Sequence, residues 1–360
     1  MRIGSLAIGL FAAILAAGCD VGGAPADVVA DCSQQMELPP SVATDILFVI
    51  DDSDSMREEQ EKVARELEAF VRALAEGPVQ NDFRIAVTTT GTTANVRLGC
   101  NEGAPTEKRS YENGELQPAT LPDDEGEGPR ILSYRDPDLL ERFATLVRRG
   151  TEGSGQEMGL EAMRLALSDS DNGFLRPGAR LLVVIVSDED DCSDPGGSAV
   201  ALGACETNPG CTSDDACEVE GAYCIPVPRT DRRACLVNAC ETPEGRAALE
   251  PVATYVEFLR NLDDGTGRGR KRETYLAVIG AVDEETEAPA RCISSSDEAY
   301  GVAVRYVEAV EAMGERGTLA SICAEDYGAA LAEIAELVRA PHVLELDPAP
   351  PDGRLVVVEI

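Results

Sequence analysis

Residues 45–56, "DILFVIDDSDSM", join an uninterrupted apolar run to a cluster of aspartates and serines. The run at 46–50 contains no polar residue, which is typical of a strand covered on both faces in a parallel sheet. The runs "LLVVIV" at 181–186 and "TYLAVIG" at 274–280 have the same character, and "FRIAVTTT" at 83–90 predicts a fourth strand. The sequence therefore predicts a mostly parallel sheet with 46–50 in its interior.

Amphipathic helices are predicted between these strands. Apolar residues recur at helical spacing in five segments, namely 63–74, 137–147, 155–167, 251–262 and 327–338. Strands that alternate with helices form open α/β sheets with right-handed crossovers. We therefore expect an α/β fold with a doubly wound, mostly parallel sheet flanked by helices.

The composition restricts the class of partner. The 360 residues include 66 acidic and 31 basic side chains, which gives a formal net charge of -35. Such a chain repels phosphate backbones and anionic lipid surfaces, so nucleic acid is not expected as a partner. The hydrophobic fraction of 44% is sufficient for a large core.

The N-terminus has the pattern of an export signal. One positive residue, Arg2, precedes an apolar run that is short for a membrane span and ends in small residues, which predicts a signal peptide over 1–18. The end of the run, "LAAGC" at 15–19, resembles a bacterial lipobox, which implies lipid attachment to Cys19. A plain secretory signal is the alternative. Residues 19–42 then form a tether to a bacterial membrane, with the outer membrane or cell surface favoured.

Twelve cysteines in an exported chain indicate disulfide bonds. If Cys19 carries lipid, eleven remain, so one unpaired thiol is expected. The cluster in 189–242 contains no CxxC pair, and the single histidine, His342, lies far away in sequence, which argues against a zinc site. We expect a disulfide-stapled insertion that contains Cys192, Cys205, Cys211, Cys217, Cys224, Cys235 and Cys240.

Three stretches depart from the alternation of strands and helices and are predicted as surface insertions in one domain over 43–340. They are 91–130, the cysteine-rich 189–242, and 283–318, for which a polar loop and a helix are expected. Residues 341–360 contain two short apolar runs around a proline-rich Asp-Gly turn, which predicts a C-terminal β extension.

Polar side chains follow two of the predicted strands. Asp51, Ser53 and Ser55 leave the strand at 46–50, Asp188 leaves the strand at 181–186, and Thr151 lies in a loop that enters a helix. In a doubly wound sheet, such loops meet beyond the carboxyl ends of the strands. Two carboxylates and three hydroxyls suit a hard divalent cation, Mg²⁺ first, with Mn²⁺ or Ca²⁺ as alternatives. Two negative charges neutralise such an ion and leave it able to accept a carboxylate from outside.

This pattern resembles the von Willebrand factor A domain with its metal-ion-dependent adhesion site (MIDAS), which has Asp-x-Ser-x-Ser after the first strand, a later Thr, and an Asp after the fourth strand. The resemblance covers 43–340 and implies a Rossmann-like fold without catalysis. It further implies adhesion-type binding of a protein partner through an exposed Glu or Asp. In the family the serines contact the ion directly, and the other ligands do so directly or through water. The matching residues here are Asp51, Ser53, Ser55, Thr151 and Asp188, with Ser154 as the alternative to Thr151.

Additional aspartates near the site leave other functional hypotheses open. Asp52, Asp54 and Asp190 are candidates for a second cation, such as calcium, or for solvated bystanders. The spacing of Asp52 and Asp54 also resembles haloacid-dehalogenase phosphatases, but that family needs a lysine near the phosphate, and none stands in a fitting motif among Lys62, Lys108 and Lys271. A structural scaffold of the envelope that uses no metal is a third reading.

Overall fold

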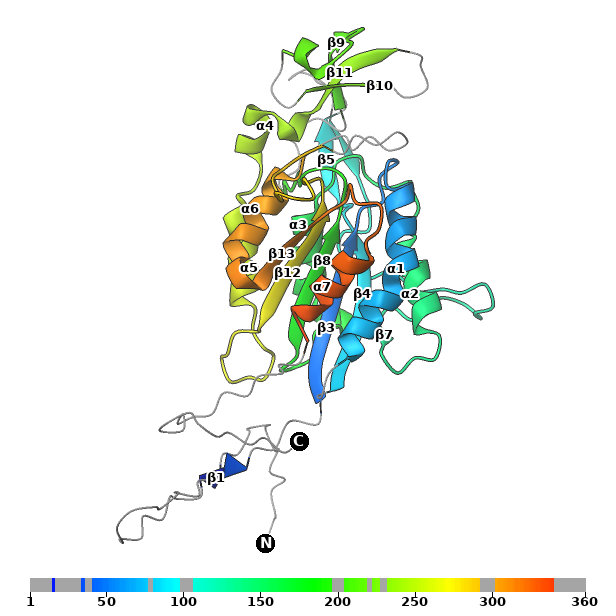
Figure 1. Cartoon of the computed structure of the whole chain (residues 1–360), viewed down its shortest axis with the longest axis vertical. Coiled ribbons are helices and arrows are strands. Elements are labelled where there is room, and N and C mark those ends of the chain that lie inside the picture. Colours follow the sequence, from blue (N-terminus) through cyan, green and yellow to red (C-terminus); the bar gives the residue numbers. More distant parts are fainter. Residues whose placement is uncertain are drawn as a thin grey trace, which may run out of the picture.

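The computed structural model describes residues 15–16, 34–35, 41–76, 80–97, 106–195, 204–218, 222–226, 232–291 and 302–339. Its centre is a six-stranded sheet in the order β13-β12-β8-β3-β4-β7, in which only β7 is antiparallel to its neighbour (Figure 1). The strands are β3 (Ser41–Ile50), β4 (Gln80–Thr89), β7 (Leu132–Ser133), β8 (Arg180–Val186), β12 (Thr274–Gly280) and β13 (Gly317–Ser321). The prediction of a mostly parallel sheet is confirmed.

The two central strands are β3 and β8. Every residue in 46–50 and 181–186 is fully buried, as their continuous apolar runs predict. Numbered along the chain, the six strands have the order 3-2-1-4-5-6, so the winding reverses between β3 and β8. Their register pairs Ile50 with Val186, so both strands end at the same level. Ligands of doubly wound sheets bind in the crevice at this switch point.

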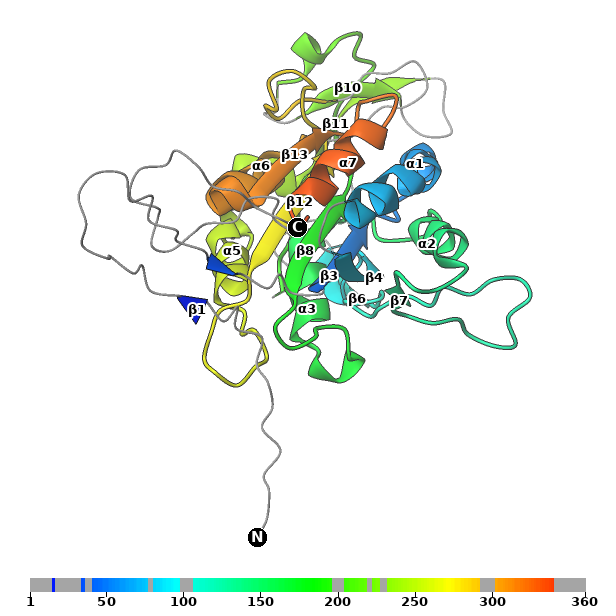
Figure 2. The same cartoon turned by 60° about the horizontal axis from the view of Figure 1, so that its bottom comes forward.

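Helices cover both faces of the sheet (Figure 2). One face carries α1 (Arg57–Ala75), α2 (Leu139–Val147) and α7 (Gly328–Glu336). The other carries α3 (Gly159–Ser168), α5 (Val252–Asn261) and α6 (Val304–Met313). The helices predicted from the sequence correspond to α1, α2, α3, α5 and α7. On the first face, Phe48 of β3 packs edge-to-face on Phe70 of α1 and Phe143 of α2, with centroid distances of 5.5 and 5.1 Å.

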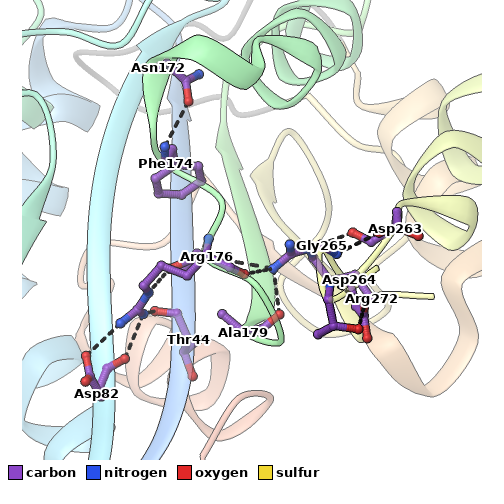
Figure 3. Close-up of polar contacts among 12 residues, drawn as sticks. Thr44, Asp82, Asn172, Phe174, Arg176, Ala179, Asp263, Asp264, Gly265 and Arg272 are labelled. Carbon is purple, nitrogen blue, oxygen red and sulfur yellow. Dashed lines mark hydrogen bonds and ion pairs between the residues drawn. The ribbon is translucent and has the colours of Figure 1, made fainter. Parts of the chain in front are cut away.

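Buried charge at the amino edge of the sheet is paired with arginine. Asp45, which is fully buried, accepts a hydrogen bond from Arg176 Nε at 2.6 Å. Arg176 Nη1 also donates to Asp82 at 2.7 Å, and Arg272 donates to the carbonyl oxygens of Arg176 and Ala179 (Figure 3). The acid at this end of β3 therefore has a counter-cation within the protein.

The cysteine-rich insertion forms a small antiparallel sheet beyond the carboxyl edge of the main sheet (Figure 1). Disulfides join Cys192 to Cys240, Cys211 to Cys224, and Cys217 to Cys235, so the stapled insertion is confirmed. No cysteine is free in the part of the chain that the structure describes, and Cys19 lies outside that part. The strands are β9 (Ala204–Pro209), β10 (Tyr223–Pro226) and β11 (Arg233–Asn238), and the short helix α4 (Pro243–Ala248) follows them.

Of the other two predicted insertions, 91–130 contains a hairpin, whereas 283–318 contains elements of the main fold. Range 91–130 contains the hairpin of β5 (Ala94–Arg97) and β6 (Thr106–Arg109). By contrast, α6 and β13 belong to the main fold rather than to an insertion at 283–318, because β13 pairs in parallel with β12. β13 is a five-residue edge strand with one buried residue, so it lacks the apolar run that marks the interior strands.

The ends of the chain are described only in part. Two-residue strands β1 (Leu15–Ala16) and β2 (Gln34–Gln35) pair with each other, and β3 begins two residues before the predicted start of the domain. The predicted β extension at 341–360 lies outside the described residues. Within the described residues, we find no helix that is both long and apolar enough to cross a bilayer.

Candidate metal centre at the switch point

Asp51 is fixed across the two central strands. Its backbone N–H donates to Val186 O at 2.9 Å, which continues the pairing of β3 with β8 by one residue. Its Oδ1 accepts from the backbone N–H of Ser53 at 2.8 Å, and its Oδ2 accepts from Ser187 Oγ at 2.6 Å. The carboxylate is fully buried, so its position is set by these three bonds. Ser187 was not predicted as part of the site.

Ser53, Ser55 and Asp188 form a chain of side chains next to Asp51. Ser53 Oγ lies 3.1 Å from Ser55 Oγ, and Ser55 Oγ donates to Asp188 Oδ1 at 3.1 Å. Ser53 and Asp188 are buried, with exposed fractions of 5% and 4%. The structure thus brings together four of the five residues that the sequence assigned to the site.

The loop at 148–158 is held against this cluster by Gln60 of α1. Gln60 Nε2 donates to Asp51 O at 2.8 Å and to Gly150 O at 2.9 Å, and Gly150 N–H donates to Gln60 Oε1 at 3.1 Å. The N–H of Gly153 donates to Asp52 O at 2.8 Å. Gln60 is buried and was not singled out in the sequence, because a glutamine on a helix carries no specific signal.

Neither hydroxyl proposed for the fifth position bonds to the other four residues. Thr151 Oγ1 accepts a hydrogen bond from Arg57 Nη2 at 3.2 Å on the exposed side of the loop. Ser154 is buried, and its hydroxyl donates to Gln156 O at 3.0 Å and accepts from Gln156 N at 3.1 Å. The loop is therefore in place, whereas these two hydroxyls are engaged elsewhere.

Glu157 is a further buried acid of this loop, and the sequence pattern did not single it out. It is fully buried, and neither oxygen of its carboxylate has a hydrogen-bond partner. The negative charges of Glu189 and Asp51 act on it. In the sequence it resembles Glu161, which is also buried but pairs with Arg164 at 2.8 Å. Only tertiary contacts distinguish the two glutamates.

Burial and like charges raise the pKa values of the acids at this site. Burial raises the pKa of Asp51 to about 7, against hydrogen bonds from Ser187 and Ser53 that lower it. Burial, and then the charges of Asp51 and Glu189, raise the pKa of Asp188 well above its ordinary value. Burial, Glu189 and Asp51 raise the pKa of Glu157 in the same way.

None of these three acids forms an ion pair with a described basic residue. Asp45 at the opposite edge, by comparison, pairs with Arg176. Buried, ionised carboxylates without a counter-cation are costly.

The extra acids occupy different surroundings. Asp54 is exposed, whereas Asp52 is buried against the loop, where burial and Glu112 raise its pKa to about 7 and Arg149 opposes the shift. Asp52 and Asp54, the two carboxylates whose spacing resembles haloacid-dehalogenase phosphatases, thus lie in different environments. Asp190 accepts a hydrogen bond from the N–H of Arg305, at the start of α6, at 2.8 Å.

The donor set fits a hard cation. Hydroxyl and carboxylate oxygens are the ligands that Mg²⁺, Mn²⁺ and Ca²⁺ prefer. No three carboxylates of the described residues converge within 4.8 Å; the group of ligand atoms that does so is Cys211, Cys217 and Cys235. All three cysteines are in disulfides, which removes them as zinc ligands. The switch point therefore offers serine hydroxyls among carboxylates rather than a preformed cage of three acids.

Comparison with known proteins gives structural similarity only. No protein-family profile matches the sequence, and no curated protein matches it. Among solved structures, it is similar to a von Willebrand factor type A protein from Catenulispora acidiphila (14% identity, TM-score 0.33), covering 83% of this chain and 42% of that one. It is also similar to an adhesive tip pilin from Group B Streptococcus agalactiae, with 11% identity and a TM-score of 0.37. That match covers 82% of this chain and 98% of the pilin chain. A third similar structure is that of an aerotolerance-related membrane protein from Bacteroides fragilis, with 13% identity and a TM-score of 0.31. That match covers 82% of this chain and 98% of the Bacteroides chain.

These identities and TM-scores are too low to transfer a function, and the chain spans less than half of the Catenulispora protein. The fold is recognised from the chain's own features. The strand order 3-2-1-4-5-6 with an antiparallel third strand, and the turn of Asp51, Ser53 and Ser55 at its switch point, give this chain the doubly wound α/β fold that its resemblance to the von Willebrand factor A domain implies.

Proposed function

We propose that the domain binds a protein partner through a divalent cation held by Asp51, Ser53, Ser55 and Asp188. The observation that supports this most is the burial of Asp51 and Asp188 beside two serine hydroxyls with no basic residue to neutralise them. Mg²⁺ is the first choice of ion, with Mn²⁺ or Ca²⁺ as alternatives. When bound, the ion supplies an open coordination position for an oxygen ligand.

The chain's own residues favour an acidic ligand at that position. The serines contribute oxygens without charge, and Asp51 and Asp188 contribute two negative charges that balance a divalent ion. A carboxylate from an exposed Glu or Asp of a partner then completes the coordination without strong repulsion. We propose binding rather than catalysis, as the resemblance to the von Willebrand factor A domain implies.

We also propose that the domain acts outside the cytoplasm, on the cell envelope. Three disulfides among the described residues are typical of an oxidising compartment. Lipid attachment at Cys19 stays a prediction from the sequence, and it is the only membrane contact that we propose.

Calorimetry with MgCl₂, MnCl₂ and CaCl₂ tests the metal site. We expect the native protein to bind one ion per chain, and Ser53→Ala to weaken binding by at least about tenfold because a direct ligand is lost. Ser168→Ala, on the exposed surface of α3, is the matched control and should bind as the native protein does. If the native protein binds none of the three ions, the proposal fails.

Capture from envelope extracts tests the partner. The native protein should retain a protein that is released by a chelator and is not retained by Ser53→Ala. A partner that stays bound in chelator, and equally to Ser53→Ala, would support the metal-free scaffold instead.

A further inference from the structure

We infer that Glu157 is the loop ligand of this cation, in the place that the resemblance assigns to Thr151. The inference rests on the proposed metal site and adds a third carboxylate to it. Its basis is that Glu157 is fully buried with both oxygens unpartnered, beside Asp51. A buried carboxylate in this state is stabilised only by a cation or by a proton.

Other buried acids of the domain have a cation from the chain. Asp45 pairs with Arg176, Asp191 with Arg305 at 3.0 Å, and Glu161 with Arg164. Glu241 also lacks hydrogen bonds to its carboxylate, but the positive charge of Arg246 acts on it. Besides burial, the negative charges of Glu189 and Asp51 and the adjacent side chain of Glu189 all raise the pKa of Glu157, and no basic residue is among these influences.

The backbone around Glu157 is fixed from two sides. Its carbonyl oxygen accepts from Cys192 N at 2.6 Å, and the next N–H, of Met158, donates to Thr90 O at 3.1 Å. These bonds tie the residue to the loop after β8 and to the end of β4. The side chain therefore starts from a backbone held by the two strands, β8 and β4, that flank β3 in the sheet.

A third carboxylate changes the charge of the site. Asp51, Asp188 and Glu157 together bring three negative charges to a divalent ion, so the loaded site retains one net negative charge. The ion is then held more tightly than by two carboxylates, while an external carboxylate is attracted less strongly. The ligand oxygens of Asp51, Asp188 and Glu157 do not all lie within 4.8 Å of one another. On this proposal, ion binding draws the Glu157 side chain inward.

Glu157→Gln tests the inference against two controls in the same loop, Thr151→Val and the exposed Glu152→Gln. We expect the affinity for Mn²⁺, measured by calorimetry, to fall by at least about tenfold in Glu157→Gln and to be unchanged in both controls. In EDTA, the melting temperature of Glu157→Gln should exceed that of the native protein, because an unpaired buried charge has been removed. On Mn²⁺-saturated protein, acetate should bind Glu157→Gln more tightly than it binds the native protein.

Two outcomes would overturn the inference. One is native Mn²⁺ affinity in Glu157→Gln with a lower melting temperature in EDTA, which is the signature of a merely structural residue. The other is loss of Mn²⁺ binding in Thr151→Val. Either result leaves the proposed function standing as long as the native protein binds the ion, whereas absence of binding to the native protein removes both. Glu157→Asp keeps the charge on a shorter side chain, and we expect it to bind Mn²⁺ more weakly than the Thr151→Val protein.

Discussion

Asp51 and Asp52 are neighbours in the sequence but have different surroundings in the structure. Asp51 is bonded to Ser53 and Ser187 at the switch point, whereas Asp52 lies against the loop at Gly153. The spacing of the Asp-x-Ser-x-Ser motif was sufficient to select Asp51 rather than Asp52. The sequence did not select Glu157, because an acid just before a helix has no periodic pattern and its lack of a partner is a tertiary property.

Gly153→Ala should disturb the loop that carries Glu157. A Cβ atom at this position would lie 2.2 Å from Asp52 Oδ1 and 2.7 Å from Asp52 O, so the backbone has to move. We expect a loss of about 1–3 kcal/mol of unfolding free energy in urea, as for other overpacked sites, together with weaker cation binding. Gly155→Ala in the same loop meets nothing within 4 Å and serves as the control. Equal stability of the two variants would contradict this placement of the loop.

The raised pKa of Asp51 predicts a specific pH dependence for the metal-free protein. The folded chain keeps the proton on Asp51 up to about pH 7, whereas the unfolded chain releases it near 3.8. The folded state binds more protons between these values, so its stability falls as pH rises through this window. In EDTA, we expect a lower melting temperature at about pH 7.5 than at about pH 5, and a larger rise on adding Mg²⁺ at the higher pH. A melting temperature in EDTA that rises with pH across this range would contradict the prediction.

At the scale of elements, interior strands were predictable and edge strands were not. The runs at 46–50 and 181–186 are buried on both faces, so their composition alone identifies them. β7 has two residues and β13 has five, with little burial, so neither carries such a run. The segment after β8 also escaped prediction: Asp191 accepts from Leu160 N at the start of α3 and pairs with Arg305 at the start of α6.

Arg305→Met should therefore loosen two helices at once. Arg305 donates to Asp191 Oδ2 from Nε at 3.1 Å and from Nη2 at 3.0 Å, and Nη2 also donates to Glu250 O at 2.8 Å. The variant leaves a buried carboxylate without its cation, which typically costs about 3–5 kcal/mol of unfolding free energy. Arg316→Met, at an exposed position, is expected to change stability by less than about 0.5 kcal/mol. Equal denaturation midpoints for the two variants would contradict this role for Arg305.

At the scale of the whole molecule, two parts are stabilised differently. The main sheet and its helices share one large apolar core. The insertion has a small cluster in which Cys211, Cys224 and Cys235 are joined by Ala222 and Val237. So small a core does not support a sheet by itself, which is why crosslinks are needed there. The cysteine spacing predicted a stapled insertion, but pairing depends on which strands become neighbours, and the sequence left it open.

Reduction should thus unfold the insertion before the main domain. With dithiothreitol, we expect faster hydrogen exchange in the β9–β11 sheet, while amides in 46–50 and 181–186 stay protected. The unreduced protein is the control. Simultaneous loss of protection in both parts would show that they form one cooperative unit.

The most direct test of the central claim is an anomalous difference map from crystals grown with Mn²⁺. Our account predicts one strong peak at the switch point, in contact with the oxygens of Ser53, Ser55 and Asp188. A map with no peak there, or with its strongest peak elsewhere on the domain, would contradict the claim that these residues hold a cation.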